Sequence, residues 1–476
     1  MAYIQFLGAA GTVTGSKHLV NTEPAGGQRG LQVLIDCGMF QGHKQWRTRN
    51  WQDTPIPARL IDAVILTHAH IDHAGWVPRL IQEGFRGTIY ATPPTVDLCG
   101  VMLPDSGHLQ EEEAEYANRK KTSKHHPALP LYTLAQAQES LKYFEAVEFG
   151  EKRELSPELS FRYLRAAHIL GSAMVEVKLS SAQGTRTLLF SGDIGRVRDT
   201  EIAPGKVIST GPDEVERADI LVMESTYGNR QHPHTDPRPE LARLLREAAA
   251  RGGSVVVPAF AVERTQKFLF LLKALMESGE APRIPVFADS PMALQAMRIF
   301  LDHESEFSVQ TRELIATYGS PFEWEGFTFS SKAEDSKKIN ELRYPVVIVS
   351  SSGMVTGGRI LHHLMHRLPD PRNLVLFIGF QAPGSRGATI KSRAETVRIF
   401  GQDVPIRAQV AALEQFSDHA DTPELLQWLR TFPKPPDVTY LVHGEPTASA
   451  KLREAIASEL GWKVEIAEWM QKVEAS

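Results

Sequence analysis

The sequence predicts an α/β protein with parallel sheets that carry polar residues at the ends of their strands. Short apolar runs rich in β-branched residues recur along the chain and end in Gly, Asp or His, as in LQVLIDCG, DAVILTHAH, RTLLFSGDIG, DILVMESTYG and TYLVHGE. Helical patterns alternate with such runs from Ala218 to about residue 380. This alternation is typical of parallel sheets, and open α/β sheets bind ligands at the carboxyl ends of their strands. We therefore expect the chemistry of this chain at strand ends.

The chain of 476 residues is long enough for two or three domains. Helical patterns begin at Asp236 and Glu263 and lie in a segment that alternates strands with helices. We place boundaries near Gly228 and Gln402, which gives segments 1–228, 229–402 and 403–476. Because two histidines beyond the second boundary, His419 and His443, also follow strand-like runs, we interpret the middle segment as an insertion into one catalytic domain.

Composition and cysteine usage exclude several classes of protein. The formal net charge of -5 gives no global basic field, so nucleic-acid binding would require a local patch. The two cysteines, Cys37 and Cys99, exclude a disulfide framework and favour a reducing compartment, so we expect a cytoplasmic protein. The N-terminus lacks the features of a signal peptide, and no run of about 18 apolar residues predicts a membrane span. We expect no membrane partner, and the sequence is compatible with either a monomer or a homodimer.

The stretch THAHIDHAG, from Thr67 to Gly75, places three histidines and an aspartate within six positions. The run before it predicts a strand and the run after it a helix, so the four groups share one tight turn. Protonated imidazoles at this density would repel one another, whereas metal binding explains the crowding. The alternation of the groups allows two sets of ligands to face two neighbouring metals. Other strand ends offer further ligands, namely Asp36, His168, Asp193 and His443.

These motifs resemble a known family. The pattern H-x-H-x-D-H, followed by a lone histidine and then SGDIG, resembles the metallo-β-lactamase superfamily. The elements MESTYG, FSDHAD and LVHGE are similar to motifs A, B and C of its β-CASP branch of nucleic-acid-processing nucleases. The segment DSGHLQEEEAEYANRKK is also similar to bacterial and archaeal relatives of the 73-kDa subunit of the cleavage and polyadenylation specificity factor. The resemblance spans nearly the whole chain. It implies an αββα metallo-β-lactamase sandwich interrupted by an inserted parallel-sheet α/β β-CASP domain.

The resemblance also implies two metal ions and assigns their ligands. The first metal is assigned His68, His70 and His168. The second is assigned Asp72, His73 and His443, with Asp193 bridging both. By the family pattern the metals are two Zn²⁺, although ligation by nitrogen and oxygen alone also accepts Mn²⁺ or iron. Asp36 is expected to orient the ligand loop through hydrogen bonds.

The expected reaction is phosphodiester hydrolysis. Two metals lower the pKa of a shared water, and the bridging hydroxide attacks the phosphorus. His419 in FSDHAD is the expected general acid for the departing ribose oxygen, because an imidazole titrates near the operating pH. Glu224, at the end of DILVMES, is expected to hold His419 protonated. The predicted catalytic residues are therefore His419, Glu224, Asp72 and Asp36.

Substrate contacts are predicted in the middle segment. The turn SSSGMVTGG offers hydroxyl and N–H groups that suit a phosphate, although an ordinary Gly-rich connection has the same composition. We expect contacts from Ser350, Ser351, Ser352 and Gly353. Arg386, in GFQAPGSRG, is expected to contact the nucleic-acid backbone, with a solvated charged face as the alternative.

The predicted function is a metal-dependent ribonuclease acting on single-stranded RNA as an endonuclease, a 5′-to-3′ exonuclease or both. A thioester hydrolase of the glyoxalase II type shares the metal loop but does not need the insertion. DNA-repair members of the β-CASP branch lack a histidine at motif C, where this chain has His443. A non-catalytic RNA-processing scaffold would have lost metal ligands. A DNA-processing nuclease and a scaffold remain the alternatives.

Overall fold

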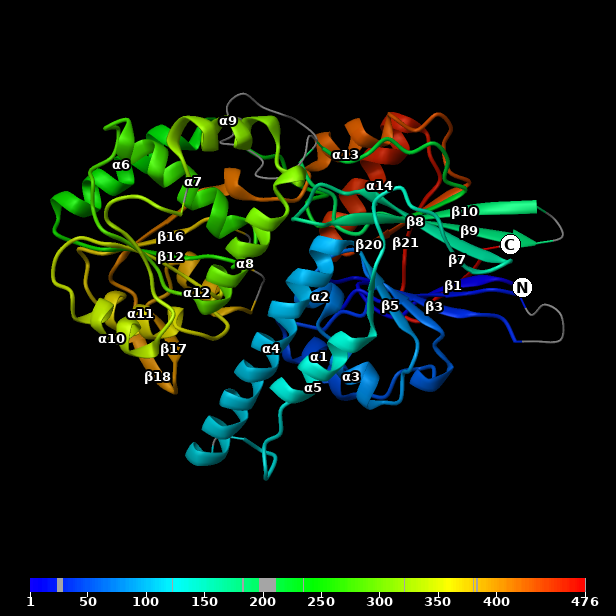
Figure 1. Cartoon of the computed structure of the whole chain (residues 1–476), viewed down its shortest axis with the longest axis horizontal. Helices are drawn as coiled ribbons and strands as arrows, with labels where there is room; N and C mark the ends of the chain where they lie inside the picture. Colours follow the sequence, from blue (N-terminus) through cyan, green and yellow to red (C-terminus); the bar gives the residue numbers. More distant parts are fainter. Residues whose placement is uncertain are drawn as a thin grey trace. The chain divides into compact units, whose positions relative to one another are not determined.

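The computed structural model divides the chain into two compact units. The structure describes residues 1–476 except 24–28, 122, 182–183, 197–210, 234, 321, 380, 382–383 and 476. Unit 1 comprises Met1–Arg198, Gly211–Gln231 and His419–Ser476, whereas unit 2 is built from His232–Asp418. Unit 1 is therefore assembled from the two ends of the chain, and Figure 1 shows its blue and red segments together.

Unit 1 contains two seven-stranded sheets. The first has the order β22-β1-β2-β3-β4-β5-β6, with strands Lys472–Glu474, Tyr3–Phe6, His18–Asn21, Gln32–Ile35, Ala63–Ile65, Thr88–Ala91 and Phe144–Ala146. The second has the order β21-β20-β11-β10-β9-β8-β7, with strands Val464–Ile466, Val438–Val442, Ile220–Glu224, Gly184–Phe190, Ala173–Ser181, Leu159–Arg165 and Arg153–Ser156. Strands β3 to β6 are parallel, as are β10, β11, β20 and β21.

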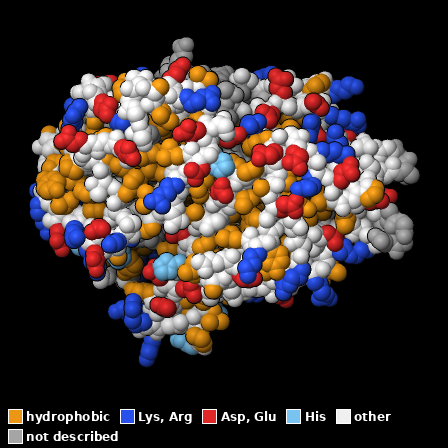
Figure 2. All heavy atoms as spheres, viewed as in Figure 1, with side chains coloured by type: hydrophobic (Ala, Val, Ile, Leu, Met, Phe, Trp, Pro, Cys, Tyr) orange, Lys and Arg blue, Asp and Glu red, His pale blue; other side chains and the backbone are white. Residues whose placement is uncertain are grey.

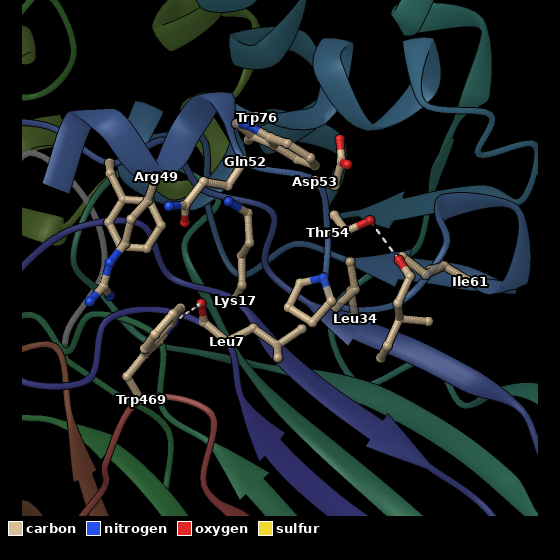
Figure 3. A pocket seen from close by; sticks show the side chains of 13 residues that line it. Leu7, Lys17, Leu34, Arg49, Gln52, Asp53, Thr54, Ile61, Trp76 and Trp469 are labelled. Atoms are coloured by element: carbon tan, nitrogen blue, oxygen red, sulfur yellow. Dashed lines mark hydrogen bonds between the residues drawn. The ribbon is translucent and has the colours of Figure 1, made fainter.

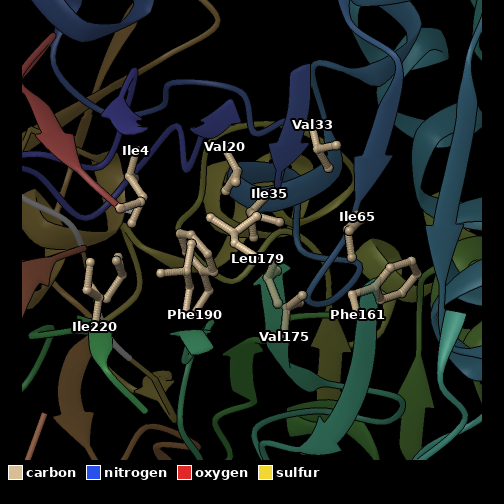
Figure 4. Packing of buried hydrophobic residues seen from close by; sticks show 14 of the residues in the cluster. Ile4, Val20, Val33, Ile35, Ile65, Phe161, Val175, Leu179, Phe190 and Ile220 are labelled. Carbon is tan, nitrogen blue, oxygen red and sulfur yellow. The ribbon is translucent and has the colours of Figure 1, made fainter. Parts of the chain in front are cut away.

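The core of unit 1 lies between these sheets. Apolar side chains on the inner face of each sheet interdigitate, as Figure 4 shows. They include Ile4, Val20, Val33, Ile35 and Ile65 from the first sheet and Phe161, Val175, Leu179, Phe190 and Ile220 from the second. Because burial of apolar surface is the main favourable contribution to folding, this interface fixes which strand ends meet at one edge.

Helices cover the outer face of each sheet in unit 1 (Figure 1). The first sheet is associated with α1 (Lys44–Arg47), η1 (Thr48–Trp51), η2 (Ala58–Leu60), α2 (Ile71–Ala74), α3 (Val77–Gln82), α4 (Pro93–Lys120), α5 (Leu134–Ser140) and η3 (Leu141–Tyr143). The second packs against α13 (Thr422–Leu429) and α14 (Pro446–Leu460). The layers are therefore α, β, β, α, which confirms the predicted sandwich.

Unit 2 has a six-stranded parallel sheet with helices on both faces, as predicted for the insertion. Its order is β14-β13-β15-β12-β16-β19, with strands Phe327–Phe329, Val286–Ala288, Val347–Ser350, Val255–Pro258, Leu374–Phe377 and Gln409–Ala412. A separate antiparallel pair is formed by β17 (Thr396–Ile399) and β18 (Gln402–Pro405). The helices are α6 (Pro237–Ala250), α7 (Arg264–Glu277), α8 (Pro291–Asp302), η4 (Glu304–Glu306), α9 (Val309–Tyr318), α10 (Ala333–Glu341), α11 (Ile360–Arg367), α12 (Arg386–Lys391) and η5 (Glu414–Phe416).

The structure divides the chain somewhat later than the positions 228 and 402 chosen from the sequence. Unit 1 continues to Gln231 and resumes at His419. Residues 403–418 group with unit 2 because β19 extends its sheet by parallel pairing with β16, with Val410 opposite Val375. A strand of four residues carries too little periodicity to show which sheet it joins.

The surface chemistry fits the modest net charge. In the face that Figure 2 shows, Lys and Arg side chains are intermixed with Asp and Glu, without a wide area of one sign. Within the described part of the chain, no helix is both long enough and apolar enough to span a membrane. Helix α4 has 28 residues, but QEEEAEYANRK makes its second half strongly polar.

Candidate metal centre

The THAHIDHAG loop leaves β4 and enters α2, so a strand end presents its first histidine and a helix its last. His68 follows the strand closely, His70 is the residue before the helix, and Asp72 and His73 lie in its first turn. The loop lies so close to Gly38 that a Cβ there would be 1.6 Å from the carbonyl oxygen of Asp72. This contact requires glycine at position 38.

One group of ligand atoms is formed by His68, His70, His168 and Asp193, whose ligand atoms lie within 4.8 Å of one another. The distance from His68 Nε2 to His70 Nδ1 is 3.0 Å, and that from His168 Nε2 to His70 Nδ1 is 3.4 Å. Three imidazole nitrogens thus converge on one point. The structure therefore brings together the residues predicted for the first metal.

A second group of ligand atoms is formed by Asp72, His73 and His443. His443 Nε2 is 3.2 Å from His73 Nε2 and 3.5 Å from Asp72 Oδ2. His443 reaches this point because β20 pairs in parallel with β11, which places its carboxyl end beside Glu224. The predicted ligands of the second metal therefore also meet.

Asp193 lies between the two groups and faces each with a different oxygen. Its Oδ2 is 3.6 Å from Nε2 of both His68 and His168. Its Oδ1 is 3.4 Å from His73 Nε2 and from His443 Nδ1. This two-sided position is the one required of a bridging carboxylate.

The Asp36 carboxylate fixes the THAHIDHAG loop through hydrogen bonds. Its Oδ1 accepts hydrogen bonds from the Thr67 amide at 2.8 Å and hydroxyl at 2.9 Å. Its Oδ2 accepts from the Ser16 hydroxyl at 2.9 Å and lies 2.7 Å from His73 Nδ1. A proton on Nδ1 leaves His73 Nε2 free to act as a ligand, which is the usual arrangement of a metal-binding histidine.

Two threonines, which were not predicted from the sequence, contact Nδ1 of two other histidines in the way that Asp36 contacts Nδ1 of His73. The Thr67 hydroxyl lies 3.0 Å from His68 Nδ1, and the Thr226 hydroxyl lies 3.1 Å from His443 Nδ1. Each contact favours a proton on Nδ1 and an open Nε2. Thr67 adjoins a predicted ligand in the sequence and could have been found. Thr226 lies far along the chain from His443 and could not.

The electrostatics of the site favour a cation. Burial lowers the pKa of His68 well below its usual value, so this imidazole is neutral and offers a lone pair. Burial by itself raises the pKa of Asp72 and of Asp193, but the neighbouring histidines have the larger effect. They lower the pKa of Asp72 to about 2 and that of Asp193 well below its usual value. Burial lowers the pKa of His73, but Asp193 and Asp36 outweigh it and raise that pKa well above normal. A divalent cation can replace this proton in the field of the carboxylates.

An oxygen atom of Asp193 also indicates that these ligand atoms suit a divalent metal. Among the described residues, Asp193 Oδ1 is a buried atom without a hydrogen-bond partner. The two nearest nitrogens, His73 Nε2 and His443 Nδ1, lie 3.4 Å away without forming a hydrogen bond. A buried anionic oxygen without a hydrogen bond is costly, and a metal ion would satisfy it. Imidazole and carboxylate ligands without thiolate suit zinc, manganese or iron.

Left-handed backbone conformations recur at these residues. The φ angle is 63° at Asp36, 49° at His443 and 59° at Ala167, which precedes His168. Such conformations cost about 1–3 kcal/mol each in non-glycine residues and persist where the surroundings hold them. Their presence at three contributors to one site indicates that side-chain placement outweighs backbone preference there.

His419 and Glu224 lie beside the first group of ligand atoms. The His419 ring centroid is 4.4 Å from that of His168, and His419 Nδ1 is 3.2 Å from Glu224 Oε2. The other carboxylate oxygen of Glu224 accepts a 2.5 Å hydrogen bond from the Ile194 amide. Glu224 is thus held by the backbone next to Asp193 and orients His419 through Nδ1.

The residues predicted to contact substrate lie in unit 2. The Ser350 hydroxyl donates to the Asp289 carbonyl at 2.8 Å, and the Ser352 hydroxyl lies 2.9 Å from that of Thr356. Ser351 and Gly353 complete the turn, and the Gly353 carbonyl accepts from Gln381. Arg386 donates to the carbonyls of Arg398, Val355 and Thr356, so much of its guanidinium stabilises the protein itself. Part of its loop, residues 380 and 382–383, lies outside the described residues.

Comparison with protein families identifies the class. Residues 28–96 match the metallo-beta-lactamase superfamily, residues 265–390 a Beta-Casp domain, and residues 403–467 a Zn-dependent metallo-hydrolase RNA specificity domain. A solved structure of a protein of unknown function from Enterococcus faecalis aligns over 99% of both chains, with a TM-score of 0.51 and 13% identity, and supports the fold alone.

Comparison with curated proteins gives closer relatives. The chain is 38% identical to Ribonuclease TTHA0252 of Thermus thermophilus over 94% of this chain and 95% of the relative. It is 30% identical to Transcription termination factor FttA of Methanocaldococcus jannaschii over 93% of this chain and 67% of the relative. An RNase J-like protein of the same archaeon is 28% identical over 87% of each chain. The chain therefore belongs to the β-CASP branch of the metallo-β-lactamase superfamily.

Replacement of Gly38 by alanine should damage the centre. The new Cβ would overlap the Asp72 carbonyl, so the loop must shift, and we expect Gly38→Ala to lose about 1–3 kcal/mol of stability and part of its metal. Gly100 lies in α4, where an added Cβ would meet no atom within 4 Å, so Gly100→Ala is the control and should be neutral or stabilising. Thermal unfolding and metal content measure both. If Gly38→Ala has the unfolding temperature and metal content of the unmodified protein, the close contact between Gly38 and the Asp72 carbonyl is contradicted.

Replacement of Asp36 by asparagine tests the hydrogen bonds that its carboxylate accepts from the THAHIDHAG loop. The amide of Asp36→Asn cannot accept hydrogen bonds at both former oxygens, although every proposed ligand stays, so we expect metal affinity to fall about 10- to 100-fold. Competition with a chelator measures this affinity. The exposed Asp403 of β18 provides the control Asp403→Asn, which should bind metal like the parent. Equal affinity of the two variants would show that Asp36 does not orient the loop.

Proposed function

We propose that this protein is a metal-dependent ribonuclease that hydrolyses phosphodiester bonds of single-stranded RNA. The observation that carries the proposal is the position of Asp193 between two converging groups of ligand atoms, with an acid–base pair, His419 and Glu224, beside it. The names of two relatives, a ribonuclease and an RNase J-like protein, and the match to an RNA specificity domain support RNA as the polymer. A thioester hydrolase would not need this domain.

In this proposal two zinc ions occupy the centre. His68, His70 and His168 would hold one, Asp72, His73 and His443 would hold the other, and Asp193 would face both. Two such ions polarise a phosphoryl oxygen and lower the pKa of a water, which makes a nucleophile available near neutral pH. Asp36, Thr67 and Thr226 keep Nε2 of their histidines directed inward.

His419 supplies the proton for the leaving ribose oxygen. Its Nδ1 faces the carboxylate of Glu224, so Nε2 is the nitrogen left to donate. The negative charge of Glu224 favours the imidazolium form that a general acid needs. The turn from Ser350 to Gly353 is proposed to bind an RNA phosphate, chiefly through backbone N–H groups because the Ser350 and Ser352 hydroxyls already have protein partners.

The activity is tested with labelled RNA that carries a 5′-monophosphate or a 5′-hydroxyl, with circular RNA and with single-stranded DNA. We expect cleavage of RNA, loss of cleavage with EDTA and recovery with Zn²⁺, because the centre is built from metal ligands. Cleavage of circles assigns an endonuclease, and mononucleotides released only from linear ends assign an exonuclease. Preference for DNA would overturn the ribonuclease proposal. Bound metal without cleavage of either polymer would indicate a scaffold.

Removal of the proposed acid should separate catalysis from metal binding. His419→Ala should keep full metal stoichiometry and lose roughly 10²-fold or more in turnover, because general acid catalysis contributes on that order. The control is His108→Ala, an exposed histidine of α4 that should leave turnover unchanged. Unchanged turnover in His419→Ala would refute its role.

A further inference from the structure

The segment HKQWRTRNW, residues 43–51, combines basic and aromatic side chains without a carboxylate. It forms α1 and η1 in unit 1, and Asn50 is the one residue of these two helices that is buried. Trp51 is 52% exposed. Such a segment builds little core, and the chain as a whole has a net charge of -5. A local basic and aromatic surface therefore needs another explanation.

Two cations of this surface, Lys17 and Arg49, lie against aromatic rings. Among the residues that the structure describes, no ion pair joins Lys17, Lys44, Arg47 or Arg49 to a carboxylate. Arg49 instead packs its guanidinium 4.1 Å from the Trp469 ring centroid and 4.5 Å from that of Trp46.

Lys17 points into a pocket beside this segment, shown in Figure 3 with Trp76, Gln52 and Trp469 around it. The pocket is open to solvent. Lys17 is only 8% exposed, and its Nζ lies 4.4 Å from the Trp76 ring and 5.2 Å from the Phe40 ring. Burial lowers the pKa of Lys17 to about 8, and the Coulombic attraction of Cys37 and Glu83 offsets only part of this effect. An anion in the pocket would satisfy this buried cation.

The aromatic walls are held in place by hydrogen bonds. The Asn50 side chain accepts from the Phe40 amide and donates to the Phe40 carbonyl, both at 2.8 Å. The Asn50 carbonyl accepts from the Trp76 indole at 3.1 Å, and the Trp469 indole donates to the Leu7 carbonyl at 3.3 Å. Trp469 nevertheless remains 46% exposed. A pre-formed pocket with an exposed ring suits a flat aromatic ligand.

We propose that this pocket, lined by Lys17, Arg49, Gln52, Asp53, Trp76 and Trp469, binds one nucleotide of single-stranded RNA. The base stacks on the exposed Trp469 ring, and the phosphodiester lies near Lys17 and Arg49. The two cations and Asp53 carry one net positive charge, which matches a single phosphodiester. Gln52 and Asp53 offer hydrogen-bonding groups at the rim. A base beside a phosphate is the ligand that aromatic rings next to cations recognise in single-stranded nucleic acid.

This nucleotide pocket uses none of the proposed metal ligands. The inference rests on the proposed function only in taking RNA as the polymer. It extends that function, because a second contact would hold RNA apart from the bond being cleaved. An apolar protein partner would leave Lys17 buried without an anion, so the chemistry of the pocket favours a nucleotide.

Equilibrium binding of a cleavage-resistant 2′-O-methyl oligoribonucleotide to the metal-loaded protein tests the pocket. Variants Trp469→Leu and Arg49→Gln, both at the surface, should each weaken binding roughly tenfold. Lys17→Met, which keeps the length of the side chain, should weaken it further and lower the slope of log affinity against log salt by about 0.7. Lys434→Met, an exposed lysine of unit 1, is the control and should bind like the parent.

The outcomes are distinct from those of the nuclease assay, because binding is measured without cleavage. Parental affinity in folded Trp469→Leu and Arg49→Gln overturns the proposal, even if Lys17→Met fails to fold. Quenching of tryptophan fluorescence by AMP without a response to the oligoribonucleotide overturns RNA as the source of the nucleotide. Loss of oligoribonucleotide binding in the variants, with a reduced salt slope, supports the pocket whether or not the protein cleaves RNA.

Discussion

The hydrogen bonds accepted by the Asp36 carboxylate are the constraint on which the metal centre depends. They join the ends of β3 and β4 to the helix that carries His73, and each of its four close contacts, from the Ser16 hydroxyl, the Thr67 amide and hydroxyl and His73 Nδ1, is 2.9 Å or shorter. A buried carboxylate without hydrogen bonds is costly, and these contacts satisfy both of its oxygens. Once it is satisfied, it fixes the tautomer of His73 and the path of the loop. The close approach of Gly38 to Asp72 follows from the same arrangement.

The second half of the centre comes from the other sheet. Asp193 and His443 follow β10 and β20, and Glu224 is the last residue of β11. These three adjacent parallel strands have their carboxyl ends at one edge. Packing of the two sheets through a common apolar core brings this edge to the THAHIDHAG loop, and the Ala173 amide donates to the Thr67 carbonyl across the two sheets. Unit 2 is inserted between β11 and β20, yet these strands pair directly. The long insertion is tolerated because the cost of closing a loop grows slowly with its length.

Several features could be predicted from sequence because their signals are local. The ligand loop, the strand-end carboxylates and the alternation of strands with helices in unit 2 all depend on residues near one another in the chain. The place of β19 in the sheet of unit 2 could not be predicted, because a strand of four residues has too weak a pattern. The contact of the Thr226 hydroxyl with His443 Nδ1 could not be predicted, because only the pairing of β11 with β20 makes the two residues neighbours. For Arg386 the sequence shows a cation in a loop but not the backbone carbonyls that it contacts, and its contact with nucleic acid stays a prediction.

The sequence by itself determined which side chains are available for the proposed metal ligation and acid–base chemistry, because residue type and spacing decide the chemistry of each motif. The tertiary structure decided how these side chains are distributed between the two groups of ligand atoms. It gave each oxygen of Asp193 a different set of histidines, and it placed Trp469, from the C-terminal segment, against Arg49 from the N-terminal segment. Such relations depend on packing between sheets and on strand pairing across hundreds of residues. No local pattern encodes these distances, because they arise only when the apolar core closes.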